Sequence, residues 1–170
     1  AYEADDLVRE VRSVRPSTVI VSSEEFMRFG FGKVMPPEIP RRMIEQLRPR
    51  QVTVVAYLRR PDRYLDSWYN QLIKLSTAQK RLATSVRRFF GGAHTAYDRG
   101  LRYWRDDVGC DELVVRDYDE LEGGAIISDF EAATGIHVPL DADAAPRFSN
   151  PRIDNNFIEY ARRRAVAAPQ

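Results

Sequence analysis

Arginine, serine and aromatic side chains gather in residues 54–71, which read VVAYLRRPDRYLDSWYNQ. Arg59 follows an apolar, β-branched run and precedes Pro61, which cannot donate to a strand ladder and therefore ends the strand. Ser67 stands eight residues after Arg59, where apolar residues recur with helical spacing. A guanidinium and a hydroxyl that converge at the carboxyl end of a strand can bind a phosphate group.

These side chains also have purely structural interpretations. Arg59 could cap the edge of the sheet through a salt bridge, and Ser67 could be an ordinary helix hydroxyl. Trp68 and Tyr69 are mainly expected in the core, although one of them could flank a nucleobase. The residue types alone leave both interpretations open.

A second polar group follows the apolar run at residues 18–21. Because reacting groups gather where strands end in open α/β sheets, Glu24 is the candidate general base. Ser23 and Glu25 are candidate contacts to an acceptor substrate. The alternative for all three residues is an exposed acidic turn or the start of a helix.

The composition predicts one soluble globular domain over residues 1–170, with a flexible tail after about residue 166. Apolar residues make up 44% of the chain and charged residues 30%. The net charge of +1 provides no global field for binding nucleic acid or an acidic membrane. The single cysteine excludes an intrachain disulfide and is typical of a reducing compartment. No apolar run reaches the roughly 20 residues of a membrane span, and no signal peptide is visible, so the cytoplasm is expected.

The periodicity predicts strands separated by helices, and therefore a parallel sheet flanked by helices. The expected strands are residues 18–21, 52–58 and 113–115. The expected helices are residues 7–14, 39–47, 64–80, 87–92, 97–108, 126–133 and 153–161. Three strands are few for a sheet of this kind, so the chain is expected to be part of a longer protein.

Several of these segments, in this order, resemble the sulfotransferases that use 3′-phosphoadenosine 5′-phosphosulfate (PAPS), in their bacterial and heparan-modifying branches. The 3′-phosphate motif of that family is similar to Arg59, Arg60, Pro61 and Ser67 with the adjacent aromatic residues. The segments TVIVSSEEF, LVVRDYDEL and FEAATGI also resemble family segments, and the likeness covers residues 17 to 165. It implies a fold like that of the P-loop nucleotide kinases, with Arg59 and Ser67 binding the cofactor.

Two family features are missing or weak in this sequence. The Gly/Thr-rich loop that wraps the 5′-phosphosulfate is absent, as is any G-x-x-x-x-G-K-[ST] motif. The family strand that carries this loop is central, so the fold is expected to be incomplete at the N-terminus. In the late nucleotide-binding loop, Arg147 or Arg152 would have to replace the family's basic residue.

The resemblance implies transfer of a sulfuryl group from PAPS to a hydroxyl or amine, with a saccharide as the expected acceptor. A metal is not expected, because His94 and His137 have no Cys or His neighbours at metal-ligand spacing. The alternative is a non-catalytic, truncated relative that binds a glycan or a protein partner. A P-loop kinase is a weaker alternative, because neither the Walker loop nor an obvious magnesium carboxylate occurs.

Overall fold

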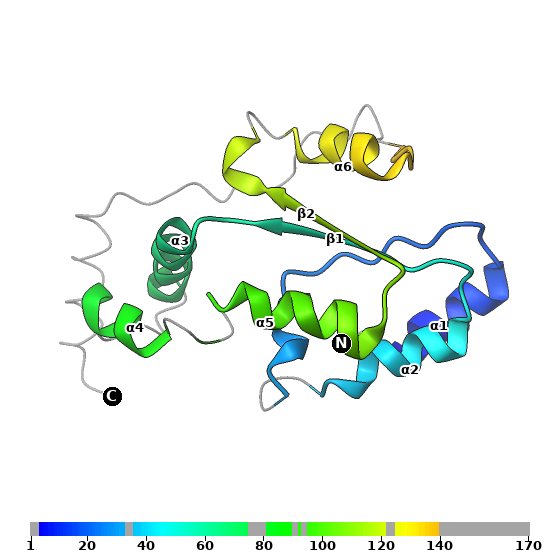
Figure 1. The fold of residues 1–170 in the computed structure, drawn as a ribbon, viewed down its shortest axis with the longest axis horizontal. Helices are drawn as coiled ribbons and strands as arrows, with labels where there is room; N and C mark the ends of the chain where they lie inside the picture. Colours follow the sequence, from blue (N-terminus) through cyan, green and yellow to red (C-terminus); the bar gives the residue numbers. More distant parts are fainter. Residues whose placement is uncertain are drawn as a thin grey trace. The chain divides into compact units, whose positions relative to one another are not determined.

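The computed structural model describes residues 4–32, 36–74, 81–89, 92, 95–121 and 125–139. The chain, whose helices and strands Figure 1 labels, divides into two compact units. Unit 1 comprises residues 1–56 and 96–115, and unit 2 comprises residues 57–95 and 116–170. The division passes through both strands, and the prediction of one domain stays a prediction.

The described residues form helices and two strands, with several helices between the strands. The helices are α1 (Ala4–Val14), α2 (Glu38–Leu47), α3 (Pro61–Lys74), α4 (Leu82–Phe89), α5 (Tyr97–Arg102) and α6 (Ile126–Thr134). The strands are β1 (Thr53–Leu58) and β2 (Glu112–Asp117). Two short 3₁₀ helices, η1 (Phe26–Gly30) and η3 (Tyr118–Glu120), and one π-helical segment, η2 (Tyr103–Val108), complete the set.

The two strands form a small parallel sheet in which β1 and β2 are neighbours. In unit 1, the Val52 carbonyl accepts hydrogen bonds from the backbone N–H groups of Asp111 and Glu112, at 2.9 and 3.3 Å. The Asp111 carboxylate in turn accepts from the Val52 N–H at 2.7 Å. Because parallel strands end at the same edge, the segments that follow β1 and β2 meet there. A mixed α/β architecture with a parallel sheet is therefore confirmed.

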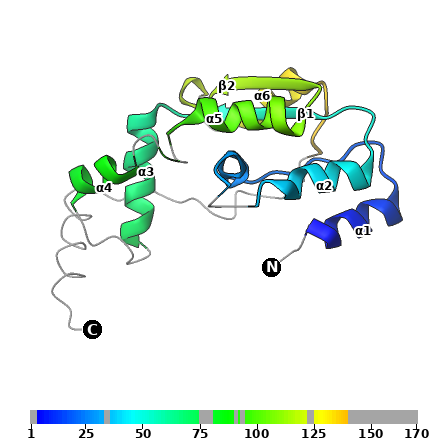
Figure 2. The ribbon, with the colours of Figure 1, turned by 60° about the horizontal axis from the view of Figure 1, so that its bottom comes forward.

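Aromatic residues form the core of unit 1. Phe29, Tyr103 and Trp104 are buried and pack together, with Phe26 against them. The Trp104 indole N–H donates to the Phe26 carbonyl at 3.1 Å, which satisfies the buried polar atom of that ring. In the same unit α1 packs against α2, and Figure 2 shows the two helices side by side.

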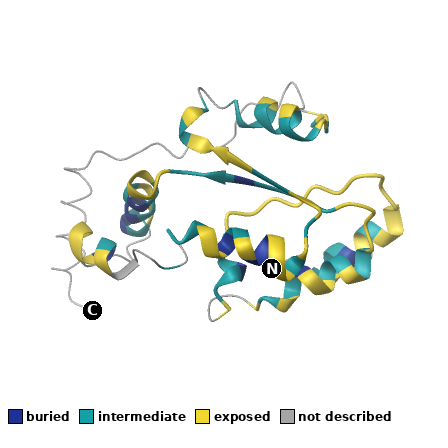
Figure 3. Ribbon diagram, in the orientation of Figure 1, coloured by how far each residue is buried: buried dark blue, intermediate teal, exposed yellow. Residues whose placement is uncertain are grey.

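In unit 2, the inner face of α3 is the main buried surface. Leu65, Tyr69 and Ile73 are buried at four-residue spacing, and α3 carries dark blue segments in Figure 3. Helix α4 packs against α3. The burial of Tyr69 agrees with its expected place in the core.

The predicted strand at residues 18–21 is wrong. These residues form no regular element, and Val19, Ile20 and Val21 expose 40%, 50% and 39% of their surface. A β-branched run has strand propensity, but a strand forms only where a neighbour pairs its backbone groups. Within the described residues, only β1 and β2 are paired in that way.

The other predicted elements are confirmed where the structure describes them, with shifted ends. Helix α3 begins at Pro61 rather than residue 64, because proline is favoured in the first helical turn. Helix α4 (Leu82–Phe89) shares only residues 87–89 with the helix predicted at 87–92, and residue 92 lies in a bend, so that prediction is only partly confirmed. The expected helix over 97–108 changes to π-helical geometry at Tyr103, and Gly109 ends it with a φ of +73°. The expected helix at 153–161, the tail after 166 and residues 75–80 lie outside the described residues.

None of the helices that the structure describes has the length and apolar content needed to cross a membrane.

Candidate functional site

Within unit 2, two arginines approach one carboxylate at the end of the sheet; one arginine directly follows β1 and the other lies in α3. Arg59 directly follows β1, and its Nε lies 3.8 Å from Asp119 Oδ1. Arg63, in the first turn of α3, places Nη1 3.4 Å from the same oxygen. Asp119 lies in η3, directly after β2, so the parallel pairing of the strands brings these residues together. We call Arg59, Arg63 and Asp119 the arginine–aspartate cluster.

Hydrogen bonds to the backbone hold Asp119 in place. Its Oδ2 accepts from the Arg60 N–H at 2.8 Å, and its own N–H donates to Asp117 Oδ1 at 2.8 Å. The bond from the Arg60 N–H, assisted by Arg63 and Arg59, holds the pKa of Asp119 below its ordinary value, although desolvation opposes the shift. Asp119 therefore remains a fixed anion at neutral pH.

The arginines are more accessible than the carboxylate that they approach. The side chain of Asp119 is 13% exposed, whereas those of Arg59 and Arg63 are 31% and 56% exposed. The Arg59 guanidinium also lies over the ring of Tyr118, with Cζ 4.3 Å from the ring centroid. A ligand could thus reach both guanidiniums from solvent while Asp119 stays largely covered.

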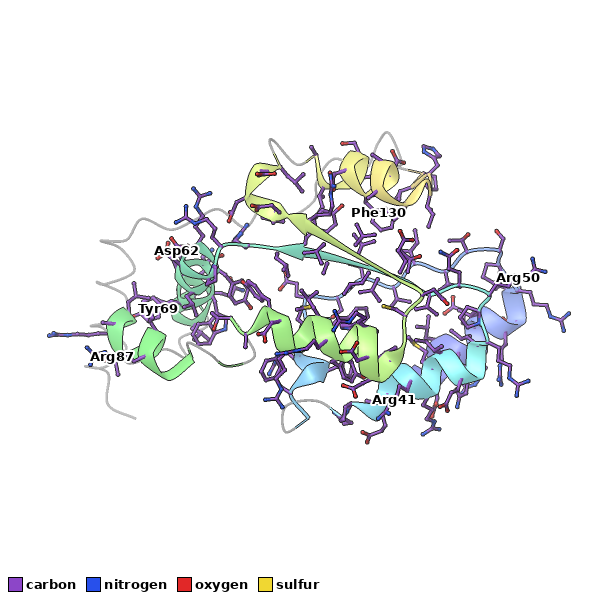
Figure 4. The ribbon with its side chains drawn as sticks, viewed as in Figure 1. Arg41, Arg50, Asp62, Tyr69, Arg87 and Phe130 are labelled. Carbon is purple, nitrogen blue, oxygen red and sulfur yellow. The ribbon has the colours of Figure 1, made fainter. Side chains whose placement is uncertain are left out.

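Asp62 occupies the positive end of α3, where Figure 4 labels it. It accepts two hydrogen bonds from the Arg60 guanidinium, at 3.2 and 2.9 Å. Desolvation acts to raise the pKa of Asp62, but hydrogen bonds from the Arg63 backbone N–H and from Arg60 outweigh it and lower the pKa. Carboxylates thus already meet the backbone donors of residues 60 and 63 at this helix start.

Ser67 lies on α3, four residues after Arg63, and is exposed. Residues four apart are neighbours on one face of a helix, so the hydroxyl stands one turn beyond the Arg63 side chain. The structure gives no hydrogen bond between Ser67 and Arg59. Whether both bind one ligand stays a prediction.

A second network ties α6 to the strand ends in unit 2. The Tyr57 hydroxyl donates to Asp129 Oδ2 at 2.9 Å, and Arg116 binds both oxygens of the same carboxylate. Desolvation, followed by the bond to Asp129 and its charge, raises the pKa of Tyr57 to about 12. At neutral pH this phenol is a hydrogen-bond donor that helps to position α6.

The candidate acidic residues lie in unit 1. The Ser23 hydroxyl accepts from the Glu25 backbone N–H at 3.1 Å, and the Glu25 carboxylate pairs with Arg28. Glu24 is exposed in the turn before η1. These contacts match the alternative of an exposed acidic turn, and the catalytic role of Glu24 stays a prediction.

A cavity of about 210 Å³ lies along α3 and α4 in unit 2. Leu65, Leu82 and Val86 supply its apolar lining, and Asp62 and Asp66 supply two carboxylates. Among the described residues, neither an arginine nor a lysine lines it. Its described lining therefore offers carboxylates rather than the cationic donors that bind phosphate.

Sequence reasoning missed three contributors to the arginine–aspartate cluster. Arg63 has a detectable signal, because it stands four residues after Arg59 and four before Ser67. Asp119 and Tyr118 have none, because their proximity to Arg59 depends on strand pairing across about 60 residues of chain. Arg147 and Arg152 lie outside the described residues.

Among the described residues, no group of three or more His, Cys, Asp or Glu side chains could hold a metal ion.

Comparison with known proteins gives one significant relative and no family assignment. The chain is 29% identical over 123 residues to an uncharacterized protein of Archaeoglobus fulgidus. The match covers 71% of this chain and 31% of the relative, so the chain spans about a third of that protein's length. No family model matches the sequence, and no solved structure matches it.

Proposed function

We propose that the arginine–aspartate cluster, together with Ser67, binds the 3′-phosphate of PAPS, and that the chain is part of a PAPS-dependent sulfotransferase. One observation carries the proposal. The guanidiniums of Arg59, directly after β1, and Arg63, in the first turn of α3, approach the same oxygen, Asp119 Oδ1. A point that two guanidiniums can reach together is a point where a phosphate oxygen can be bound.

The neighbouring groups suit a nucleotide. Ser67 adds a hydroxyl donor one helical turn beyond Arg63. The Arg59 guanidinium lies over the Tyr118 ring, with Cζ 4.3 Å from the ring centroid, so an aromatic ring stands next to the proposed phosphate site. The resemblance of residues 59–71 to the family's 3′-phosphate motif adds support that does not depend on these contacts.

The proposed reaction resembles phosphoryl transfer. PAPS would supply an activated sulfuryl group, with adenosine 3′,5′-bisphosphate as the leaving group. In unit 2, Arg59 and Arg63 would orient the nucleotide and offset its negative charge. A general base would accept the proton of an acceptor hydroxyl or amine, and Glu24, in unit 1, stays the candidate that the sequence suggests for this role. A saccharide acceptor, and the P-loop kinase-like fold of the whole protein, rest on the family resemblance alone.

A non-catalytic module is the second candidate. One observation favours it: Arg59 already forms the ion pair expected of a structural residue. Such a module would bind a glycan or a protein partner and would not distinguish nucleotides by their 3′-phosphate.

Calorimetric titration tests the proposal with adenosine 3′,5′-bisphosphate, against adenosine 5′-monophosphate as the ligand without a 3′-phosphate. We expect selective binding of the bisphosphate, and Arg59→Ala should weaken it about ten- to a hundredfold, the range of one charge-assisted hydrogen bond. Arg105→Ala is the matched control, because Arg105 is an exposed arginine paired with Asp106 in unit 1. An equal loss for both nucleotides, or no preference in the wild type, would refute the assignment.

A further inference from the structure

We infer that Asp119 competes with the ligand for the anion site. Its carboxylate pairs with Arg59 and Arg63 in the free protein, and a phosphorylated ligand replaces it as their partner. This inference rests on the proposed function, since it assigns a regulatory residue to the same site. It identifies Asp119 as a determinant of affinity. The ligand class is a phosphate ester that carries two negative charges.

The two oxygens of Asp119 have different surroundings. Oδ2 accepts a short hydrogen bond, 2.8 Å, from the backbone N–H of Arg60. Oδ1 meets the guanidiniums at 3.8 and 3.4 Å, both longer than the 2.7–2.9 Å of close charge-assisted hydrogen bonds. The carboxylate is therefore anchored through one oxygen and loosely paired through the other.

The partial exposure of both guanidiniums allows a ligand to replace Asp119 Oδ1 as their partner. The covered carboxylate cannot leave without breaking its bond to the Arg60 N–H. The guanidiniums are partly exposed and sit on flexible side chains, so they can turn toward a ligand in solvent. Binding would thus move the arginines and leave Asp119 in place.

A fixed carboxylate beside a bound phosphate opposes binding in two ways. It competes for both guanidiniums in the free protein, and it repels the phosphate charge in the complex. Removal of its charge should therefore tighten binding. Ion pairs whose arginine is partly exposed are individually weak, so the two pairs of Asp119 predict an effect of about three- to tenfold.

Asp119→Asn is the direct test, because asparagine retains a carbonyl oxygen for the Arg60 N–H, removes the charge and replaces the oxygen that faces the guanidiniums with an NH₂ group that cannot accept from them. We expect it to bind adenosine 3′,5′-bisphosphate about three- to tenfold more tightly than the wild type does. Binding of adenosine 5′-monophosphate should change less. Asp106→Asn is the matched control, since Asp106 also pairs with an exposed arginine but lies in unit 1.

The outcomes separate this inference from the proposed function. If the wild type selects the bisphosphate but Asp119→Asn binds it equally or less well, Asp119 organises the arginines and the competitor role is wrong. If neither protein selects the bisphosphate, the proposed function itself is wrong and the inference fails with it. If the asparagine variant does not fold, Asp119→Ser gives the same comparison, because its hydroxyl is also uncharged and can accept a hydrogen bond.

Discussion

Replacing Tyr57 with phenylalanine should remove the part of the stability loss at high pH that comes from ionisation of the Tyr57 hydroxyl. The Tyr57 hydroxyl donates to Asp129 and lies 3.4 Å from the Ile126 carbonyl, so its proton joins the end of β1 to α6. Ionisation would remove the donor and place a phenolate beside a carboxylate. The folded state therefore favours the neutral phenol.

The pKa gives both the sign and the pH window of the effect. The pKa of Tyr57 is about 12 in the folded protein and about 10 in an unfolded chain. A raised folded-state pKa contributes stability that is fully present below pH 10 and is lost as the pH rises to 12. A difference of two pKa units bounds this contribution at about 3 kcal/mol. Because Tyr57 is only partly buried, solvent screening should reduce it to about 1 kcal/mol.

Urea unfolding at pH 9.0 and pH 11.5 measures the contribution directly. Other groups also titrate in this range, and one of them is Tyr103, because desolvation raises its pKa. The difference in stability loss between the wild type and Tyr57→Phe therefore isolates the contribution of the Tyr57 phenol. We expect the wild type to lose about 1 kcal/mol more than the variant between the two pH values. At pH 9.0 the variant should be less stable by about 1 kcal/mol, the net value of one hydrogen bond. Equal losses in both proteins would refute the argument that Tyr57 carries a raised pKa.

Two further predictions concern packing in unit 1. Trp104→Phe should lower the free energy of unfolding by about 1–3 kcal/mol, because it leaves the Phe26 carbonyl without its indole donor and opens space in the aromatic core. Thermal unfolding followed by near-UV circular dichroism measures this loss, and an unchanged Tm would contradict the prediction. Gly100→Ala should cost about 1–3 kcal/mol through overpacking, because an added Cβ would lie 3.0 Å from the Met27 carbonyl oxygen; the flexible Met27 side chain, with Cε at 2.7 Å, can move aside, but the backbone cannot. Gly109→Ala is its matched comparison, since a Cβ there meets nothing within 4 Å and only the φ of +73° opposes it, at about 1 kcal/mol. A larger loss for Gly109→Ala than for Gly100→Ala in chemical denaturation would show that backbone conformation outweighs packing at these two positions.

Local signals predicted most of the helices and the strand before Arg59. Pro61 marks both the end of β1 and the start of α3, because proline cannot donate to a strand ladder yet fits the first helical turn. Gly109 and Gly135 follow the last residues of their helices and have positive φ, which glycine adopts readily. The spacing of the apolar residues before them indicated where these helices end. These features depend on a few neighbouring residues, which a single sequence displays directly.

Features that depend on distant pairing were not predictable from the sequence. The strand expected at residues 18–21 has the right residue types, but propensity does not provide a neighbour for its backbone groups. The contact between Arg59 and Asp119 joins the ends of two strands far apart in the chain, and no local pattern specifies their register. The same limit applied to Tyr57 and Asp129, since the sequence gives no sign of that hydrogen bond.

The charges of the cluster limit how tightly unit 2 alone can bind a nucleotide. Arg59, Arg60 and Arg63 contribute three positive charges, and Asp62 and Asp119 offset two of them. A 3′-phosphate carries close to two negative charges, so these five side chains do not neutralise it. Helix α3 adds little, because carboxylates already accept from the backbone donors of residues 60 and 63. Affinity should therefore fall as salt rises, since exposed arginines supply most of the attraction. Selectivity between the two nucleotides, measured at one salt concentration, is consequently a stronger test of the site than affinity for either one.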